Sequence, residues 1–321
     1  MAPPGAESPA KLSNLRHLAG GRLDSGYMWE QVGLWEEVGL PRLSADGVLL
    51  NLCNLAPVAK RQQVVVVHDA TTRAKPDVHP RAFRSIYSMI LPIVTRRVAK
   101  LVTISEFSRA EISRWYGVPA SRLTMCHEGA EHILDEPPEP SIWTRRGLAK
   151  GGFLLAVGMA GTHKNLPLLL EAFSRARLSD IRLVVTGLRS ARVLGNAGLH
   201  LPPGIVYVGH VAKAELRALY EGALALAYPS SYDGFGLPPL EAMACGCPVV
   251  ISDQPALVEV AGGAARVCPT GDATELAVAL QEVRDPALRA RLAKLGLERA
   301  RQFTWRATAE RLLAQCRAAA T

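Results

Sequence analysis

Short apolar runs alternate with amphipathic segments throughout the second half of the chain. The apolar runs have the length of buried strands, whereas the longer segments between them carry apolar residues at helical spacing. This alternation predicts a parallel sheet with helices on both faces. Strands are expected at 153–157, 181–186, 205–208, 223–228 and from 249 onward, and helices at 166–176, 214–221 and 272–283.

The first half of the chain alternates in the same way over a shorter span. A basic and apolar stretch at 83–101 has helical periodicity, although Pro92 should bend or interrupt that helix. Ser105 or Ser108 can cap the next helix, because a serine hydroxyl accepts a hydrogen bond from a free N–H of the first turn. Strands are expected at 48–53, 64–67 and 101–105, and helices at 83–101 and 109–116.

A proline-rich, acidic segment at 135–141 separates the two halves. It lacks periodic apolar positions, which is typical of a linker. Doubly wound domains bind ligands at the carboxyl ends of their strands, so a site between the two halves is expected. We predict an α/β fold with a first domain at 1–147, a second domain at 148–303 and a terminal helix at 304–321.

The composition favours a globular, cytoplasmic protein. Of 321 residues, 49% are hydrophobic and 21% charged, which is enough for two complete cores. The N-terminus lacks a basic start followed by an apolar core, and no apolar run is long enough to span a membrane. Six scattered cysteines fit a reduced protein. A net charge of +8 would attract an anionic partner, such as a sugar nucleotide, nucleic acid or an acidic membrane.

The segment from Tyr228 to Ile251 joins an apolar run to a helix start through two glycines. Gly234 and Gly236 let backbone N–H groups approach a ligand, and a helix N-terminus behind them favours an anion such as a diphosphate. Asp233 and Glu241 can accept hydrogen bonds from hydroxyl groups. The segment predicts a sugar-nucleotide site, although a turn at Asp233 and a favourable helix dipole at Glu241 would also explain these carboxylates.

The same segment resembles the donor-site signature of the family 4 (group 1) glycosyltransferases. In that signature two glutamates flank seven residues and precede an Ala-Met-Ala-x-Gly-x-Pro-Val-Val tail. Here Asp233 and Glu241 hold the two acidic positions, and residues 242–250 match the tail. Asp233 is one methylene shorter than glutamate, so it reaches about 1.5 Å less far toward a donor hexose. The resemblance implies that Glu241 holds the nucleotide ribose.

The resemblance covers roughly residues 47–318 and implies a GT-B fold. In that fold two Rossmann-like domains face a cleft, and the last helix often crosses back to the first domain. The resemblance also implies a retaining, metal-independent transfer with no cofactor, in which a nucleoside-diphosphate sugar is the donor. Relatives carry further strand-helix units before the His-Asp segment that this chain reaches at His68. The first domain is therefore expected to be shortened.

A second segment, 158–165, places a lysine between a strand and a helix. A lysine there is usually solvated, but Lys164 can also stabilise the charge that develops on a departing diphosphate. The segment is similar to the family's basic-Lys-Asn signature, with His163 and Met159 where relatives commonly carry arginine. By resemblance, Val211 meets the nucleobase through its backbone. The donor-binding residues implied are Gly158, His163, Lys164, Val211, Asp233, Gly234, Gly236, Leu237 and Glu241.

His68 follows an apolar run, where a histidine is more often a hydrogen-bonded structural residue. The resemblance places it near the donor hexose, with a role in orientation or stabilisation. The predicted catalytic residues are therefore His68, Lys164 and Asp233. His127 and His132 are five residues apart and Gly129 interrupts helical geometry, so no zinc or other metal site is expected.

Two classes of function stay open at this point. The favoured one is a retaining hexosyltransferase of polysaccharide biosynthesis, with GDP-mannose as leading donor and a glycan or lipid-linked acceptor. The alternative is a noncatalytic relative that pairs with another transferase, because the shortened first domain and Asp233 depart from the family pattern. A sugar-nucleotide epimerase has less support. Residues 81–100 either rest peripherally on the inner face of a membrane or form a core helix with a basic edge. No nucleic-acid partner is expected.

Overall fold

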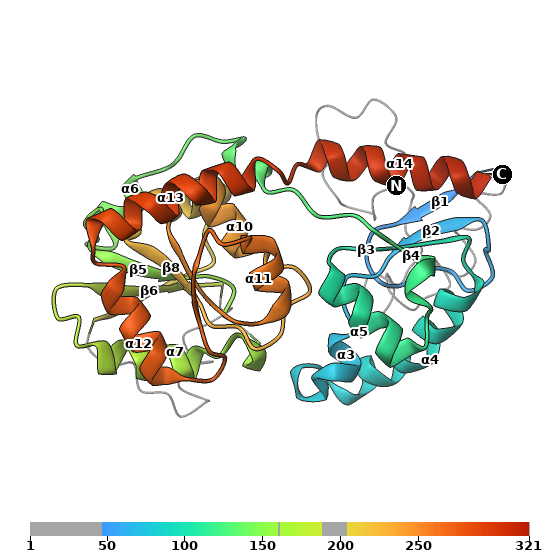
Figure 1. Cartoon of the computed structure of the whole chain (residues 1–321), viewed down its shortest axis with the longest axis horizontal. Helices are drawn as coiled ribbons and strands as arrows, with labels where there is room; N and C mark the ends of the chain where they lie inside the picture. The colour runs from blue at the N-terminus through green and yellow to red at the C-terminus, as the bar shows by residue number, and fades with distance from the viewer. Residues whose placement is uncertain (1–46, 160, 188–203, 321) are drawn as a thin grey trace, which may run out of the picture.

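The protein contains two parallel sheets, each flanked by helices. The structure, a computed structural model, describes residues 47–159, 161–187 and 204–320. Figure 1 shows the smaller sheet and its helices on the right and the larger sheet on the left. The predicted α/β class is therefore confirmed, with two parallel sheets. The part of the predicted first domain at 1–46 lies outside the described residues.

The first sheet has four parallel strands in the order β1-β2-β3-β4. Alternate residues of a strand face opposite sides, so Val65 packs on the side of α4 and α5, whereas Val64 and Val66 pack on the side of α14. The elements of this unit are β1 (Leu49–Asn51), β2 (Gln63–Val66), α3 (Thr71–Ala74), η2 (Pro76–Val78), α4 (Arg81–Arg97), β3 (Lys100–Thr103), α5 (Glu106–Tyr116), η3 (Ala120–Arg122) and β4 (Leu123–Met125).

Pro92 lies inside α4 without interrupting it. The helix ends at Arg97, so the predicted interruption is absent and the predicted helical end at residue 101 is wrong, because Lys100 already starts β3. A proline inside a helix removes one N–H and leaves the carbonyl four residues earlier without its usual partner. Here that carbonyl belongs to Ser88, and Arg73 donates a hydrogen bond to it at 3.2 Å.

The second sheet has six parallel strands in the order β10-β9-β8-β5-β6-β7. The chain starts in the centre at β5, proceeds to one edge, and then returns to β8 and proceeds to the other edge. Ligands of doubly wound sheets bind beyond the carboxyl ends of the strands where this direction changes. The switch point lies between β5 and β8. The strands are β5 (Phe153–Ala156), β6 (Arg182–Thr186), β7 (Ile205–Gly209), β8 (Ala225–Tyr228), β9 (Val249–Ser252) and β10 (Arg266–Cys268).

Helices cover both faces of the second sheet (Figure 1). α7 and α12 pack together on one face, whereas α9, α10 and α11 contact strands from the other face and α13 packs on α10. The sequence did not predict α11, α13 or β10. The helices described from Ser141 onward are α6 (Ser141–Arg145), η5 (Thr162–Lys164), α7 (Leu166–Ala176), α9 (Lys213–Gly222), α10 (Leu237–Ala244), α11 (Pro255–Ala261), α12 (Ala273–Glu282), α13 (Pro286–Ala300) and α14 (Trp305–Ala320), of which α14 belongs to the first sheet.

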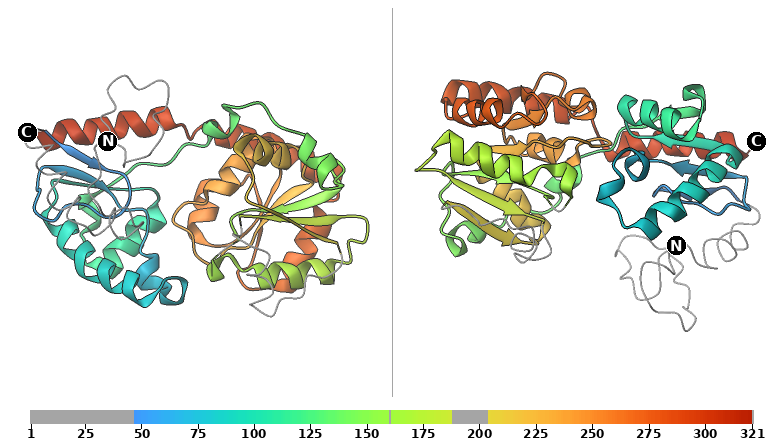
Figure 2. Two further views of the ribbon diagram at one scale, coloured as in Figure 1. Left: turned by 180° about the vertical axis from the view of Figure 1, so that it is seen from behind. Right: turned by 90° about the horizontal axis from the view of Figure 1, so that it is seen from below.

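Two segments connect the units. One follows β4 and contains the 3₁₀ helix η4 (Glu131–Leu134), and the other leads from α13 into α14. α14 packs against β2 and β3 of the first sheet, as Figures 1 and 2 show from three sides. Trp143 of α6 donates a hydrogen bond to the carbonyl of Ala218 in α9 at 3.1 Å. Residues 141–147 therefore belong with the second sheet, earlier than the predicted boundary.

The two connections pass each other closely at Gly129. A Cβ at this position would lie 2.2 Å from the backbone nitrogen of Trp305 and 2.6 Å from the carbonyl carbon of Thr304. The same Trp305 N–H donates a hydrogen bond to Glu131 Oε1 at 2.6 Å. The connecting segment and the start of α14 are thus held together, and the contact leaves no room for a side chain at residue 129.

Candidate functional site

Glycine turns follow the neighbouring strands β5 and β6, and the turn after β5 borders the switch point between β5 and β8. Gly158 has a φ of +70° and Gly187 a φ of +87°, conformations that favour glycine. A Cβ on Gly187 would lie 2.8 Å from the backbone of Gly158, so the two turns touch. At these two positions the carboxyl ends of the strands therefore carry no side chain that would keep a ligand away.

Lys164 is held between Tyr228 and Asp233 across the switch point. Its Nζ donates hydrogen bonds to the Tyr228 hydroxyl at 2.6 Å and to Asp233 Oδ2 at 2.8 Å. The side chains of Lys164 and Asp233 are only 15% and 14% exposed. Burial and the Asp233 charge raise the pKa of Tyr228 well above its ordinary value, so the phenol stays protonated. A nearly buried ion pair thus joins the ends of β5 and β8.

His163 lies next to Lys164 and has a different environment. Its carbonyl accepts a hydrogen bond from the N–H of Ser231 at 2.8 Å, which ties η5 to the loop after β8. Burial and the Lys164 charge lower the pKa of His163, which favours the neutral ring. Its Nδ1 is buried without a hydrogen-bond partner among the described residues. His163 therefore adds little positive charge beside Lys164.

Gly236 and Leu237 form the junction between the loop and α10. Gly236 has a φ of +97° and precedes Leu237, the first residue of the helix. A Cβ on Gly236 would lie 2.5 Å from Leu257 Cδ2. No side chain caps the helix N-terminus. Pro238 and Pro239 carry no N–H, and the N–H of Leu240 donates to the carbonyl of Gly236 at 3.3 Å, so the N–H of Leu237 is the donor of the first turn that can receive an anion. Gln254 fixes the loop before Gly236 by donating a hydrogen bond to the carbonyl of Asp233 at 3.1 Å.

Gly234 is the point where this loop meets the first domain. A Cβ on Gly234 would lie 2.9 Å from the carbonyl oxygen of His68 and 3.2 Å from Asp69 Cβ. The Gly234 carbonyl accepts hydrogen bonds from the hydroxyls of Ser105 at 2.6 Å and Ser108 at 3.0 Å. Residues of both domains therefore fix the position of the loop.

Glu241 lies in α10 with only 8% of its surface exposed. The Tyr220 hydroxyl donates a hydrogen bond to its Oε2 at 2.9 Å, and His132 Nε2 lies 3.0 Å from its Oε1. Burial raises the pKa of Glu241, and the hydrogen bonds from Tyr220 and His132 counteract that increase. Each carboxylate oxygen has more than one lone pair, so both can accept a further hydrogen bond.

His68 follows β2 and lines an apolar cavity of about 570 Å³ between the first sheet and α14. Its Nε2 lies 2.6 Å from the carbonyl oxygen of Leu52, and its Nδ1 lies 3.4 Å from Glu128 Oε1. Burial alone would lower the pKa of His68, but hydrogen bonds with Cys53, Glu128 and Leu52 outweigh it and raise the pKa to about 10. The raised pKa favours the protonated ring at neutral pH, which suits charge stabilisation better than proton abstraction.

Val211 lies between the end of β7 and the start of α9. Its side chain packs against the buried cluster that contains Leu219 of α9 and Leu226 of β8. The predicted donor residues therefore come from the ends of β5, β7 and β8 and from α10. Of the predicted catalytic residues, the structure brings Lys164 and Asp233 into contact. The hydrogen bonds of His68 within the described residues go to other partners.

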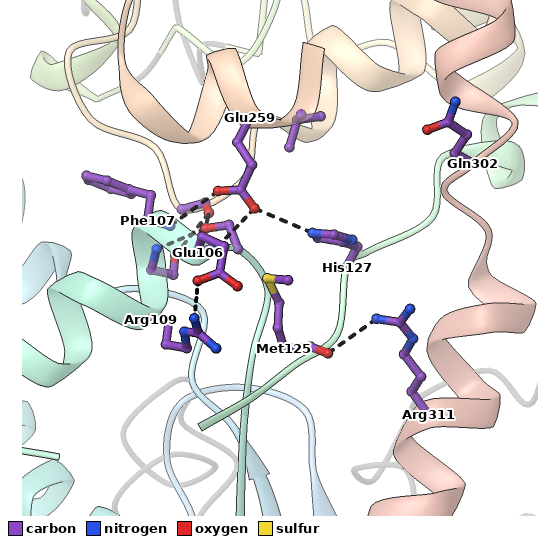
Figure 3. Close-up of polar contacts among 12 residues, drawn as sticks. Glu106, Phe107, Arg109, Met125, His127, Glu259, Gln302 and Arg311 are labelled. Carbon is purple, nitrogen blue, oxygen red and sulfur yellow. Dashed lines mark hydrogen bonds and ion pairs between the residues drawn. The ribbon is translucent and has the colours of Figure 1, made fainter. Parts of the chain in front are cut away.

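The N-terminus of α5 joins the two domains beside this loop. Glu259 of α11 accepts hydrogen bonds from the backbone N–H groups of Glu106 at 2.9 Å and Phe107 at 3.2 Å, and its Oε1 lies 3.4 Å from His127 Nε2 (Figure 3). Burial would raise the pKa of Glu259, but these hydrogen bonds outweigh it and lower the pKa. A carboxylate of the second domain thus caps a helix of the first.

Sequence reasoning missed the partners of the two acidic residues. The sequence pattern places Tyr228 in a strand and Tyr220 in a helix, and it gives His132 no role beyond the metal site that is not expected. A tyrosine at the end of an apolar run, next to an acidic loop, was the available signal for Tyr228. No group of three His, Cys, Asp or Glu side chains in the described ranges could hold a metal ion. None of the helices described is long and apolar enough to cross a membrane.

Residues 146–299 match the family described as Glycosyl transferases group 1. The chain is 31% identical over 261 residues to O-antigen chain mannosyltransferase B of Escherichia coli, which covers 78% of this chain and 68% of that protein. It is also 31% identical over 234 residues to the MMP alpha-(1→4)-mannosyltransferase of Mycolicibacterium hassiacum, covering 69% of this chain and 54% of the relative. The chain thus spans from about half to two thirds of the length of these relatives.

Solved structures resemble both units together. Sucrose-phosphate synthase from Thermosynechococcus elongatus matches with a TM-score of 0.71 and 21% identity over 87% of this chain and 75% of that chain. WaaG, a glycosyltransferase involved in lipopolysaccharide biosynthesis, matches with a TM-score of 0.65 and 16% identity over 87% and 80%. These likenesses confirm the predicted GT-B fold. Together with the match to the second domain and the Escherichia coli relative, they show that the chain belongs to the group 1 glycosyltransferases.

Proposed function

We propose that the chain transfers a hexose from a nucleoside-diphosphate sugar to an acceptor hydroxyl, with retention of anomeric configuration. The observation that carries this proposal is the ion pair of Lys164 and Asp233 at the switch point, a short loop away from the uncapped N-terminus of α10. An ammonium and the N–H of Leu237 at a helix start suit a diphosphate, and a neighbouring carboxylate suits the hydroxyls of a hexose.

In this proposal the bond between the anomeric carbon and the diphosphate breaks, and negative charge accumulates on the leaving diphosphate. Lys164 stabilises that charge, because the site is nearly buried and a cation is more effective there than in water. Asp233 accepts hydrogen bonds from the hexose. The acceptor hydroxyl forms its bond to the anomeric carbon on the face from which the diphosphate departs and gives its proton to the departing diphosphate, so no side-chain nucleophile is required. His68, as a cation, serves orientation and charge stabilisation.

The names of the relatives point to mannose as the transferred hexose. The names of several relatives specify a mannosyltransferase, among them O-antigen chain mannosyltransferase B of Escherichia coli. We propose GDP-mannose as the donor and a glycan or lipid-linked glycan as the acceptor. The nucleobase would meet the backbone near Val211, at the carboxyl end of β7.

Calorimetric titration with GDP, UDP and ADP tests the donor site. We expect GDP to bind and Glu241→Ala to weaken that binding at least tenfold, because the variant loses the acceptor for two ribose hydroxyls. Glu298→Ala is the control, since Glu298 is an exposed carboxylate of the same domain. Absence of binding to all three nucleotides would contradict the proposal. Binding with transfer only after addition of a partner transferase would favour the noncatalytic alternative.

We also propose that α4 rests on a membrane that displays a lipid-linked acceptor. Met89 and Ile93 on this helix are 64% and 39% exposed, and Arg81, Arg96 and Arg97 are exposed as well. Exposed apolar and basic side chains on one helix are typical of contact with anionic lipids. We expect salt-sensitive co-sedimentation with anionic vesicles that is lost in Arg96→Glu/Arg97→Glu. Equal binding to neutral vesicles, or none to either, would exclude this role.

A further inference from the structure

A chain of hydrogen bonds links Glu241 to the terminal helix. Trp305 Nε1 donates to His132 Nδ1 at 2.9 Å, and His132 Nε2 lies 3.0 Å from Glu241 Oε1. The other carboxylate oxygen accepts from the Tyr220 hydroxyl at 2.9 Å. We propose that His132 and Trp305 are positioning residues that hold Glu241 in the orientation required for ribose recognition. This inference rests on the proposed function, in which Glu241 binds the nucleotide ribose.

The chemistry of the indole fixes the direction of these hydrogen bonds. Trp305 Nε1–H can only donate, so His132 Nδ1 must accept and carries no proton. The imidazole proton then lies on Nε2, where it donates to the Glu241 carboxylate. In the opposite tautomer an N–H of the ring would face the indole N–H, and a lone pair would face the carboxylate. Trp305 therefore selects the tautomer that makes His132 a donor to Glu241.

The four groups come from four separate elements. Tyr220 lies in α9, Glu241 in α10, His132 in η4 and Trp305 at the start of α14. The rings of His132 and Trp305 pack edge to face, with centroids 5.9 Å apart and planes at 67°. The two connecting segments are joined a second time by the hydrogen bond from the Trp305 N–H to the carboxylate of Glu131. His132 and Trp305 therefore have little freedom to move independently.

Glu241 needs both donors to present an ionised carboxylate. It is only 8% exposed, and burial works against its charge. Two donors on different oxygens compensate for the lost water and stop the carboxylate from rotating. Each oxygen keeps a lone pair for one hydroxyl of a ribose diol. Loss of the His132 donor would leave Oε1 free to rotate or to bind a proton, and the diol would lose a partner of fixed direction.

Discrimination between ribose and 2′-deoxyribose measures this positioning directly. We would determine by calorimetry the affinity for whichever of GDP, UDP and ADP binds best and for its 2′-deoxy counterpart. In the wild type we expect the ribonucleotide to bind about tenfold more tightly, the effect of one hydrogen bond to a charged group. Trp305→Phe and His132→Asn should reduce this ratio to about twofold. Both should leave the affinity for the deoxynucleotide nearly unchanged.

Two further variants separate positioning from a structural role. Glutamine carries its amide nitrogen where imidazole carries Nε2, whereas the shorter asparagine does not, so His132→Gln should retain most of the discrimination. Trp115→Phe removes an indole donor that serves Glu111 at 3.1 Å in α5, and it should have no effect on the ratio. The unfolding temperature of each variant is measured in parallel, because a merely structural role would lower that temperature without changing the ratio.

An unchanged ratio in both Trp305→Phe and His132→Asn would overturn the positioning role alone. A wild-type chain that binds none of the three nucleotides would overturn the proposed function, and the positioning role with it. An equal loss of discrimination in His132→Gln and His132→Asn would also contradict the inference, because the donor on Nε2 would then be irrelevant.

Discussion

Replacement of Lys164 by methionine is expected to lower the turnover number for hexose transfer by about a hundredfold to a thousandfold. Methionine has nearly the same length and no charge, so the variant removes the cation without removing bulk. The departing diphosphate would then develop its charge in a nearly buried site where Asp233 is the neighbouring charge. The turnover number is measured with saturating donor, so that weaker binding does not obscure the effect.

Two controls accompany the Lys164 variant. Lys213→Met removes a surface lysine that pairs with Glu136 at 3.2 Å, and turnover should remain within about twofold of the wild type. Lys164→Met also leaves the Asp233 charge without its partner, which can destabilise the fold. The double variant Lys164→Met/Asp233→Asn should recover stability and remain inactive. Turnover near the wild-type value in a folded Lys164→Met protein would refute the assigned role.

Substitution of Gly129 by alanine is expected to reduce the free energy of unfolding by about 3 kcal/mol or more. The added Cβ would lie 2.2 Å from the backbone nitrogen of Trp305, a distance that requires movement of the backbone. The start of α14 would have to separate from the connecting segment, with loss of the hydrogen bond between Trp305 and Glu131. Urea denaturation followed by circular dichroism measures the change.

Gly47→Ala is the matched control for this substitution. Among the described residues a Cβ at Gly47 would meet no atom within 4 Å, and Gly47 does not adopt a left-handed conformation. Its free energy of unfolding should therefore stay within about 0.5 kcal/mol of the wild type. Equal denaturation midpoints for Gly129→Ala and Gly47→Ala would show that the close passage of the two connections has no energetic importance.

The second sheet could be predicted from sequence because its strands are apolar on both faces. All four residues of β5 and all four of β8 are buried. Strands that are buried on both faces appear in the sequence as continuous apolar runs, which are easily recognised. β4 and β10 have three residues each, some of them polar or half-buried, so neither produces an apolar run. In α13 only Leu292, Gly296 and Ala300 are buried, which is too narrow a stripe to detect among so many charges.

Individual site residues could be predicted where a single segment of sequence identifies them. Contacts between them could not, because these contacts depend on the order of the strands in the sheet. Lys164 and Asp233 were identified because each lies in a recognisable loop after a strand. Their contact depends on β5 and β8 being neighbours, which strand order in the chain does not reveal. The bond from Trp305 to His132 spans 173 residues and had no local signal at all. Pairings of this kind arise only after both domains and α14 have packed.

The placement of α14 affects the order in which the chain can fold during synthesis. Leu312 and Ala319 of α14 share a buried cluster with Val64 and Val66 of β2, yet the whole second domain is translated between them. While the ribosome still holds α14, the first sheet presents an apolar face to water. The second domain can complete its core earlier. Domains generally fold from the N-terminus during translation, but here the first domain must wait for the second, and the nascent chain needs protection for that interval.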